Sequence, residues 1–146
     1  MNSVFVACVG AAILAGTAWA AREATCLPGR QSAVLVSYER TGGFAGIRET
    51  LVVRRSGRAT YAQARLSGAV AFRVSCARLR ALRSALVNAQ FASLARVYAP
   101  DTEVSDGFVE RVTYGGRTVR VLSGAEPPPR LARVLAQLRG LVSRRS

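Results

Sequence analysis

The chain has 146 residues, half of them apolar, which is enough for one domain with a hydrophobic core of its own. Because it contains no histidine and only eight carboxylates, it cannot form Ser–His or Cys–His nucleophile pairs, and we expect neither an enzyme nor a site for a metal ion or cofactor. The net charge is +13, carried by 21 Arg residues that are spread along the chain without a nucleic-acid-binding motif, so we expect no nucleic-acid partner.

The N-terminal stretch Val4 to Ala20 is apolar and uncharged, and it ends in Ala18-Trp19-Ala20. Small residues on both sides of a large one are typical of a signal-peptidase site, so we predict a signal peptide over residues 1–20. The alternative is an uncleaved membrane anchor, because no basic residue precedes the stretch and Arg22 follows it. We favour export to the periplasm, the cell envelope or the medium, with contact to a membrane only if the leader is retained.

Residues 21–31 contain Pro28-Gly29 and no periodic pattern, which predicts a flexible arm before a domain over residues 32–146. Cleavage of the leader would remove Cys8 and leave Cys26 and Cys76. In an oxidising compartment two cysteines favour one disulfide, and two free thiols are the alternative. On the chain-entropy argument, a bridge between them would stabilise the fold by about 4 kcal/mol.

The first half of the domain is predicted to be extended. Its segments are rich in β-branched and aromatic residues or alternate between apolar and polar ones, and Ser56-Gly57 forms a tight hairpin turn between two of them. Thr41 to Gly46 interrupts the pattern after the first segment. The predicted strands are Ala33–Arg40, Ile47–Arg55 and Arg58–Gln63, with a further extended stretch at Ala69–Val74.

A helix is predicted to begin after Ser75, whose hydroxyl can accept a hydrogen bond from an amide of the first turn. Apolar residues then recur at helical spacing and predict about four to five turns against a core. Tyr98-Ala99-Pro100-Asp101 ends this helix, and a polar loop follows to Asp106. The apolar positions are Leu79, Leu82, Leu86, Phe91 and Leu94.

The last third of the chain predicts a hairpin and a second helix. Phe108 to Tyr114 and Arg117 to Leu122 alternate apolar with polar residues around Gly115-Gly116, a turn in which both residues need a positive φ. Three prolines, residues 127–129, then precede a leucine-rich amphipathic pattern that ends near Arg144 and Arg145. The order β-β-β-α-β-β-α predicts an α+β domain in which two helices pack on one face of an antiparallel sheet of about five strands.

This element order, together with particular residues, resembles the emfourin family of small protein inhibitors of protealysin-like, thermolysin-type metallopeptidases. The most specific match is the stretch Tyr38 to Arg48, with its Gly-Gly-Phe-Ala-Gly core. Weaker matches are Phe91 and Leu94 near the end of the first helix, Asp106-Gly107-Phe108 at the start of a strand, and Pro128-Pro129 before the last helix. The likeness covers about residues 33 to 142 and leaves out the leader, Cys26 and Cys76.

The resemblance implies inhibition by filling the cleft over the target's zinc ion rather than by chemistry, and we expect a monomer that binds a thermolysin-like metallopeptidase. The hypothetical contact residues are Gly42, Gly43, Phe44, Ala45, Gly46, Ile47 and Arg48. Thermolysin-type enzymes prefer large apolar residues beside the cleaved bond, which makes Phe44 the candidate plug. In the alternative, narrowly favoured by the sequence, the glycines supply unusual backbone angles and Phe44 folds back into the core.

Other features carry weaker hypotheses. Asp101, Glu103 and Asp106 could bind calcium, but without a matching loop pattern we expect a solvated loop. Tyr98 and Tyr114 are candidate partner contacts, although half-buried tyrosines are ordinary. The basic hairpin tip around Arg54, Arg55 and Arg58 could steer an acidic partner. The alternative function is a secreted or envelope-associated binding or structural domain with an unknown partner, which could be an anionic polymer of the envelope.

Overall fold

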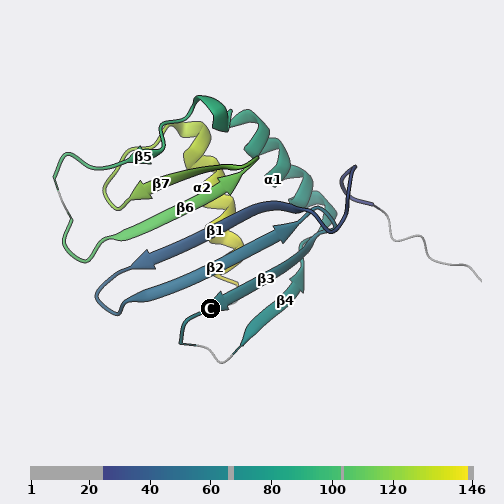
Figure 1. Ribbon diagram of the computed structural model, residues 1–146, viewed down its shortest axis with the longest axis horizontal. Coiled ribbons are helices and arrows are strands. Elements are labelled where there is room, and N and C mark those ends of the chain that lie inside the picture. The colour runs from purple at the N-terminus through teal and green to yellow at the C-terminus, as the bar shows by residue number, and fades with distance from the viewer. Residues whose placement is uncertain (1–24, 66–67, 103, 145–146) are drawn as a thin grey trace, which may run out of the picture.

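The computed structural model describes residues 25–65, 68–102 and 104–144, so the predicted signal peptide lies outside the described residues. They form an α+β fold (Figure 1). Its elements are β1 (Val34–Gly42), β2 (Ile47–Arg54), β3 (Arg58–Gln63), β4 (Ala69–Arg73), α1 (Cys76–Asn88), a 3-10 turn (Phe91–Ser93), β5 (Val97–Tyr98), β6 (Phe108–Tyr114), β7 (Arg117–Leu122) and α2 (Pro129–Val142).

The sheet has seven strands in the order β4-β3-β2-β1-β6-β7-β5. The prediction of about five antiparallel strands is wrong in detail, because β4 pairs fully with β3 and the short β5 pairs with β7 in parallel. Two residues are too few to show an alternating pattern, so β5 could not be found from periodicity. The central pairing of β1 with both β2 and β6 joins the two halves of the chain.

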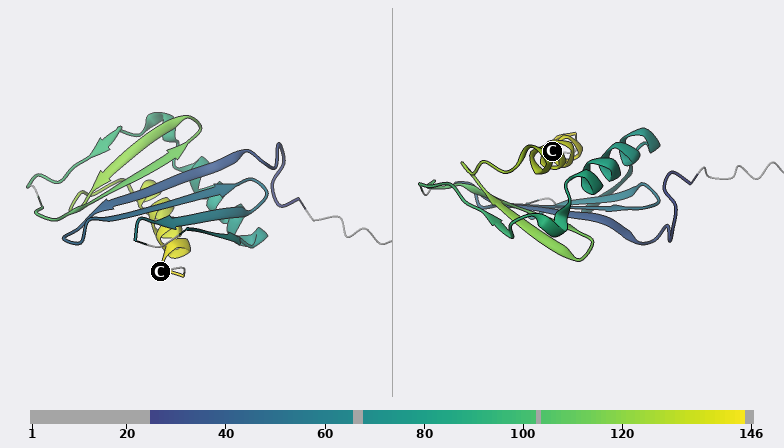
Figure 2. Two further views of the ribbon diagram at one scale, coloured as in Figure 1. Left: turned by 60° about the horizontal axis from the view of Figure 1, so that its bottom comes forward. Right: turned by 90° about the horizontal axis from the view of Figure 1, so that it is seen from above.

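Both helices cover the same face of the sheet, and the other face is left open (Figure 2). The hydrophobic core lies between the two helices and the face of the sheet that they cover. On β1 and β2 it takes Val36, Tyr38, Leu51 and Val53, which alternate with residues of the open face. On α2 the predicted stripe is buried, namely Leu131, Val134, Leu135, Leu138, Leu141 and Val142.

Helix α1 begins where predicted and ends earlier. Ser75 is the N-cap, and its hydroxyl accepts a hydrogen bond from the amide of Arg78. The helix stops at Asn88 because Gln90 adopts a left-handed conformation, with φ of 51°. The 3-10 turn that follows still buries Phe91 and Leu94, which explains why their spacing resembled a continuing helix. Within the described ranges, no helix is long and apolar enough to cross a membrane.

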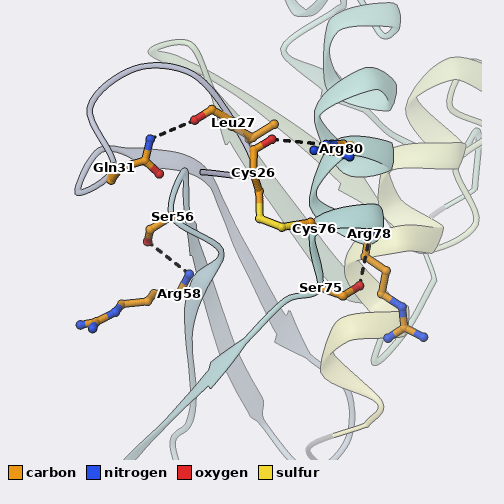
Figure 3. Close-up of a disulfide and its surroundings, with 9 residues drawn as sticks. All are labelled: Cys26, Leu27, Gln31, Ser56, Arg58, Ser75, Cys76, Arg78 and Arg80. Carbon is orange, nitrogen blue, oxygen red and sulfur yellow. Dashed lines mark hydrogen bonds between the residues drawn. A yellow bond between two sulfur atoms is a disulfide. The ribbon is translucent and has the colours of Figure 1, made fainter. Parts of the chain in front are cut away.

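The segment before β1 is fastened to the domain (Figure 3). Cys26 and Cys76 form the predicted disulfide, with their Cα atoms 5.1 Å apart, so the segment is joined to the first residue of α1. Leu27 is buried in the core beside it. The prediction of a flexible arm is therefore wrong for residues 25–31, because the covalent bond and an apolar anchor hold them in place.

Candidate partner-binding site

The hairpin turn between β1 and β2 carries the residues singled out from the sequence. Gly42 pairs with Ile47, and the turn between them is closed by a hydrogen bond from the amide of Gly46 to the carbonyl of Gly43, at 2.9 Å. Phe44 is one of the two central residues of this turn and is 94% exposed. The expectation that Phe44 folds back into the core is wrong, because the turn directs it away from the sheet.

Two glycines allow strand β6 to approach the base of this turn. Gly42 has φ of 116° and Gly43 has φ of 74°, values that favour glycine. A Cβ atom at Gly42 would lie 2.3 Å from the carbonyl oxygen of Gly107, and one at Gly43 would lie 2.7 Å from the ring of Phe108. The base of the turn therefore depends on the absence of side chains at these two positions.

Hydrogen bonds brace the turn from both sides. The amide of Gly43 donates to the carbonyl of Gly107 at 3.3 Å, and the guanidinium of Arg65 donates to the carbonyl of Ala45 at 2.6 Å. Because Gly46 already bonds the carbonyl of Gly43, the carbonyls of Gly43 and Ala45, the residues before and after Phe44, both have partners inside the protein. The turn thus presents one large apolar side chain on a backbone that is folded rather than extended.

The two remaining predicted contact residues, at the start of β2, lie on opposite faces of the sheet. Ile47 is half-buried on the side of the sheet that the helices cover, in alternation with Arg48. Arg48 is exposed on the open face, where its guanidinium lies 3.2 Å from the carboxylate of Glu39. The structure therefore groups Gly42 to Gly46 at the tip and places Arg48 at its flank.

The weaker candidates are dispersed. Asp101 and Asp106 are exposed, Glu103 lies outside the described residues, and no group of three His, Cys, Asp or Glu in the described part could hold a metal ion. Tyr98 accepts a hydrogen bond from the amide of Ala95, and Tyr114 packs edge-on against Phe91. Both tyrosines therefore have structural contacts.

Two of the three arginines at the basic hairpin tip, Arg54 and Arg55, donate hydrogen bonds to backbone carbonyls of the segment before β1. Arg54 donates to Ser32 at 2.6 Å, and Arg55 donates to Pro28 at 3.3 Å. The side chains predicted to steer an acidic partner thus help to hold residues 28–32 against the sheet.

A second feature, which the sequence did not reveal, is a cleft of about 600 Å³ between α2 and the end of the sheet that carries the turn. Two carboxylates from β2 and β6, Glu49 and Glu110, line it and are buried. The cleft also has apolar walls from β7, from α2 and from the segment that joins them, namely Val121, Ala125, Pro127, Leu135 and Val142.

The hydrogen-bonding capacity of Glu110 is used by its neighbours. Its Oε1 accepts hydrogen bonds from the hydroxyl of Tyr38 at 2.5 Å and from Nε of Arg139 at 2.8 Å, and its Oε2 pairs with the same guanidinium. Burial alone would raise the pKa of Glu110, but the bonds from Arg139 and Tyr38 outweigh it and hold that pKa below its ordinary value. Burial, together with the bond to Glu110, raises the pKa of Tyr38. Glu110 is therefore an anchor for α2.

Glu49 is different, because only one of its oxygens is hydrogen-bonded. Oε1 accepts a bond from the hydroxyl of Tyr61 at 3.0 Å. Oε2 is buried with no hydrogen-bond partner among the described residues, and the nearest cation, Nη1 of Arg40, lies 3.7 Å away. The guanidinium of Arg40 itself lies over the ring of Phe108, 3.7 Å from its centre.

No protein-family model matches the chain, and no curated protein matches it either. Function therefore has to be argued from the exposed turn and from the cleft.

Proposed function

We propose that the protein is an exported inhibitor that inserts the turn at Gly42 to Gly46 into the active-site cleft of a thermolysin-like zinc metallopeptidase, without catalysis. The observation that carries this proposal is the 94% exposure of Phe44 at the apex of a braced turn. Exposing one large apolar side chain on a rigid support is how tight protein interfaces present an anchor. The chemistry of the target comes from the resemblance to the emfourin family.

The bracing of the turn supports inhibition rather than cleavage. A peptide that is to be hydrolysed has to lie extended so that its scissile carbonyl can reach the zinc ion. Here the carbonyl of Gly43, which directly precedes Phe44, is held by the amide of Gly46, and the carbonyl of Ala45, one residue beyond Phe44, is held by Arg65. Phe44 can therefore fill an apolar subsite while the peptide bond between Gly43 and Phe44 stays in the turn.

Rigidity also supports affinity. A loop that is already held in its bound conformation loses little conformational entropy on binding, so more of the interaction energy remains as affinity. The carbonyl of Gly107 and the ring of Phe108 hold the base of the turn; Phe108 is the first residue of β6 and pairs with Gly42, and Gly107 directly precedes it. We expect the turn to keep its shape in the complex.

The test is steady-state inhibition of a thermolysin-type protease by the oxidised protein and by the Phe44→Ala variant. We expect inhibition by the parent protein and a loss of at least about 2 kcal/mol, roughly thirtyfold, in the variant, as for a buried aromatic anchor. The melting temperature should not change, because Phe44 has almost no contacts to lose. Val87→Ala is the matched control, since it trims an exposed apolar residue of α1.

Three results would overturn the proposal. The first is that no member of a panel of thermolysin-type enzymes is inhibited. The second is that Phe44→Ala and Val87→Ala inhibit as well as the parent, which would place the contact elsewhere. The third is rapid cleavage of the parent protein between Gly43 and Phe44, which would show that the turn is a substrate.

A second candidate is a binding domain for an anionic polymer of the cell envelope, and the open face of the sheet favours it. The described strands bear one carboxylate on this face, Glu39, which already pairs with Arg48 and Arg111. Exposed arginines on the same face of the described strands include Arg48, Arg54, Arg58 and Arg120. Binding of this kind should weaken steeply between low and moderate salt, whereas a plugged cleft should not respond.

A further inference from the structure

We propose that the cleft beneath α2 binds a small carboxylate with a hydrogen-bond donor on the adjacent carbon, as in an α-hydroxy acid or an α-amino acid. This site is separate from the exposed turn and does not rest on the inhibitor function. It follows from the hydrogen-bonding groups that line the cleft and remain unused within the protein.

The shape of the cleft suits a small ligand. Its volume of about 600 Å³ lies in the range of small-molecule sites, and its apolar walls are interrupted by a few convergent polar groups. The charged groups among them are Arg40, Glu49, Glu110 and Arg139, which together carry no net charge. A zwitterion would keep the site neutral, and a single carboxylate would be tolerated because the whole chain is strongly basic.

Glu49 is the reason that the ligand should carry a hydrogen-bond donor. Its side chain is only 7% exposed, and leaving the buried Oε2 without a hydrogen bond costs free energy. A hydroxyl or ammonium group in the cleft would supply the missing bond after a small rotation of the Glu49 carboxylate, because neighbouring atoms cover its Oε2. Glu110 cannot take this role, since Tyr38 and Arg139 already occupy its oxygens.

Arg40 is the reason that the ligand should carry a carboxylate. Its side chain is 35% exposed, its guanidinium carbon lies 3.7 Å from the centre of the Phe108 ring, and its Nη1 lies 3.7 Å from Oε2 of Glu49. A guanidinium binds a carboxylate through paired hydrogen bonds. Because Nη1 of Arg40 and Oε2 of Glu49 lie 3.7 Å apart, a ligand with its donor and its carboxylate on neighbouring carbons matches their spacing.

The experiment is a titration of the oxidised, isotope-labelled protein with four compounds that share a phenethyl group, followed by backbone amide NMR. The probes are 3-phenyllactate, phenylalanine, 3-phenylpropionate and phenethylamine. The first two carry both groups, the third lacks the donor and the fourth lacks the carboxylate. We expect saturable shifts at Gly124, Ala125 and Ser143 with phenyllactate, phenylalanine or both, and about tenfold weaker binding of the other two.

The comparison of phenyllactate with phenylalanine shows whether Glu49 takes a hydroxyl or an ammonium group. Equal binding of all four probes would overturn the proposal, because the cleft would then be a plain apolar recess. So would the absence of saturable shifts up to about 10 mM of any probe, which would mean that water alone satisfies Glu49.

Variants tie the shifts to the two residues. Glu49→Gln should weaken binding of the best probe by about tenfold, and so should Arg40→Met. Arg40→Met is the safer of the two for folding, because Arg40 is partly exposed and Glu49 is not. Glu39→Gln is the matched control, since residue 39 precedes Arg40 but faces the open side of the sheet. Unchanged binding in the folded Arg40→Met variant would overturn the assignment.

Discussion

The substitution Gly42→Ala tests whether the close approach of β6 holds the exposed turn. Alanine at this position keeps a backbone with φ of 116°, which costs about 1–2 kcal/mol for a residue with a side chain. Its Cβ atom would also lie 2.3 Å from the carbonyl oxygen of Gly107, so the backbone has to move. If this movement breaks one or two hydrogen bonds between β1 and β6, it adds about 1–2 kcal/mol. We expect a total loss of roughly 2–4 kcal/mol in the free energy of unfolding.

Gly46→Ala provides the control within the same turn. Gly46 has φ of 57°, and no atom lies within 4 Å of the position that a Cβ would take. Only the backbone cost remains, about 1 kcal/mol. The two variants therefore separate strain of the backbone from collision with β6.

The assay is urea unfolding of the oxidised proteins at neutral pH, followed by circular dichroism and supported by melting temperatures. At roughly 4 °C per kcal/mol, Gly42→Ala should lower the melting temperature by about 8–16 °C, and Gly46→Ala by about 4 °C. Equal losses in the two variants would refute the reasoning, because the contact with Gly107 would then contribute nothing. A smaller loss in Gly42→Ala than in Gly46→Ala would refute it more strongly.

Two further predictions concern stability. Replacing both Cys26 and Cys76 by Ser should lower the free energy of unfolding by about 4 kcal/mol. Reduction of the disulfide in the parent protein should lower the free energy of unfolding by the same amount. Unchanged urea midpoints would contradict the structural role of the bridge. Glu110→Gln should cost about 2 kcal/mol at pH 7, because the charged bonds to Arg139 and Tyr38 are weakened. The folded pKa of Glu110 is depressed, so its contribution is present above the unfolded pKa and is lost as the pH falls through the folded value. Between about pH 5 and pH 2 the parent should therefore lose more stability than Glu110→Gln, and parallel curves would contradict the assignment.

Much of the fold could be predicted because local signals agree with the tertiary structure. The Gly115-Gly116 turn and its alternating flanks gave both strands of the β6–β7 hairpin, and the cap at Ser75 gave the start of α1. The end of α1 could not be found, because Phe91 and Leu94 are buried after the helix has stopped. The spacing of these apolar residues indicates which positions are buried, not where the helical backbone ends, and buried positions continue through the 3-10 turn.

The functional features depend on contacts between distant parts of the chain. The glycines of the turn were recognised, but the exposure of Phe44 was not, since an aromatic residue beside a strand is more often buried. Nothing in the sequence pattern indicated that Glu49 and Glu110 would be buried and would line one cleft. Their partners Tyr61, Tyr38 and Arg139 come from other elements, and only the register of the strands and the position of α2 bring them together.

Phe108 lies between the two proposed sites. Its ring contacts the backbone of Gly43 at the start of the turn, and the guanidinium of Arg40 at the mouth of the cleft covers it. A ligand carboxylate that binds this guanidinium in place would offset its positive charge over the ring, and so weaken one of the contacts beside Gly43. The bonds of the turn to Gly107 and Arg65 would remain, so the turn would loosen without unfolding. If both sites exist, binding at one should thus alter affinity at the other, and by the same factor in each direction.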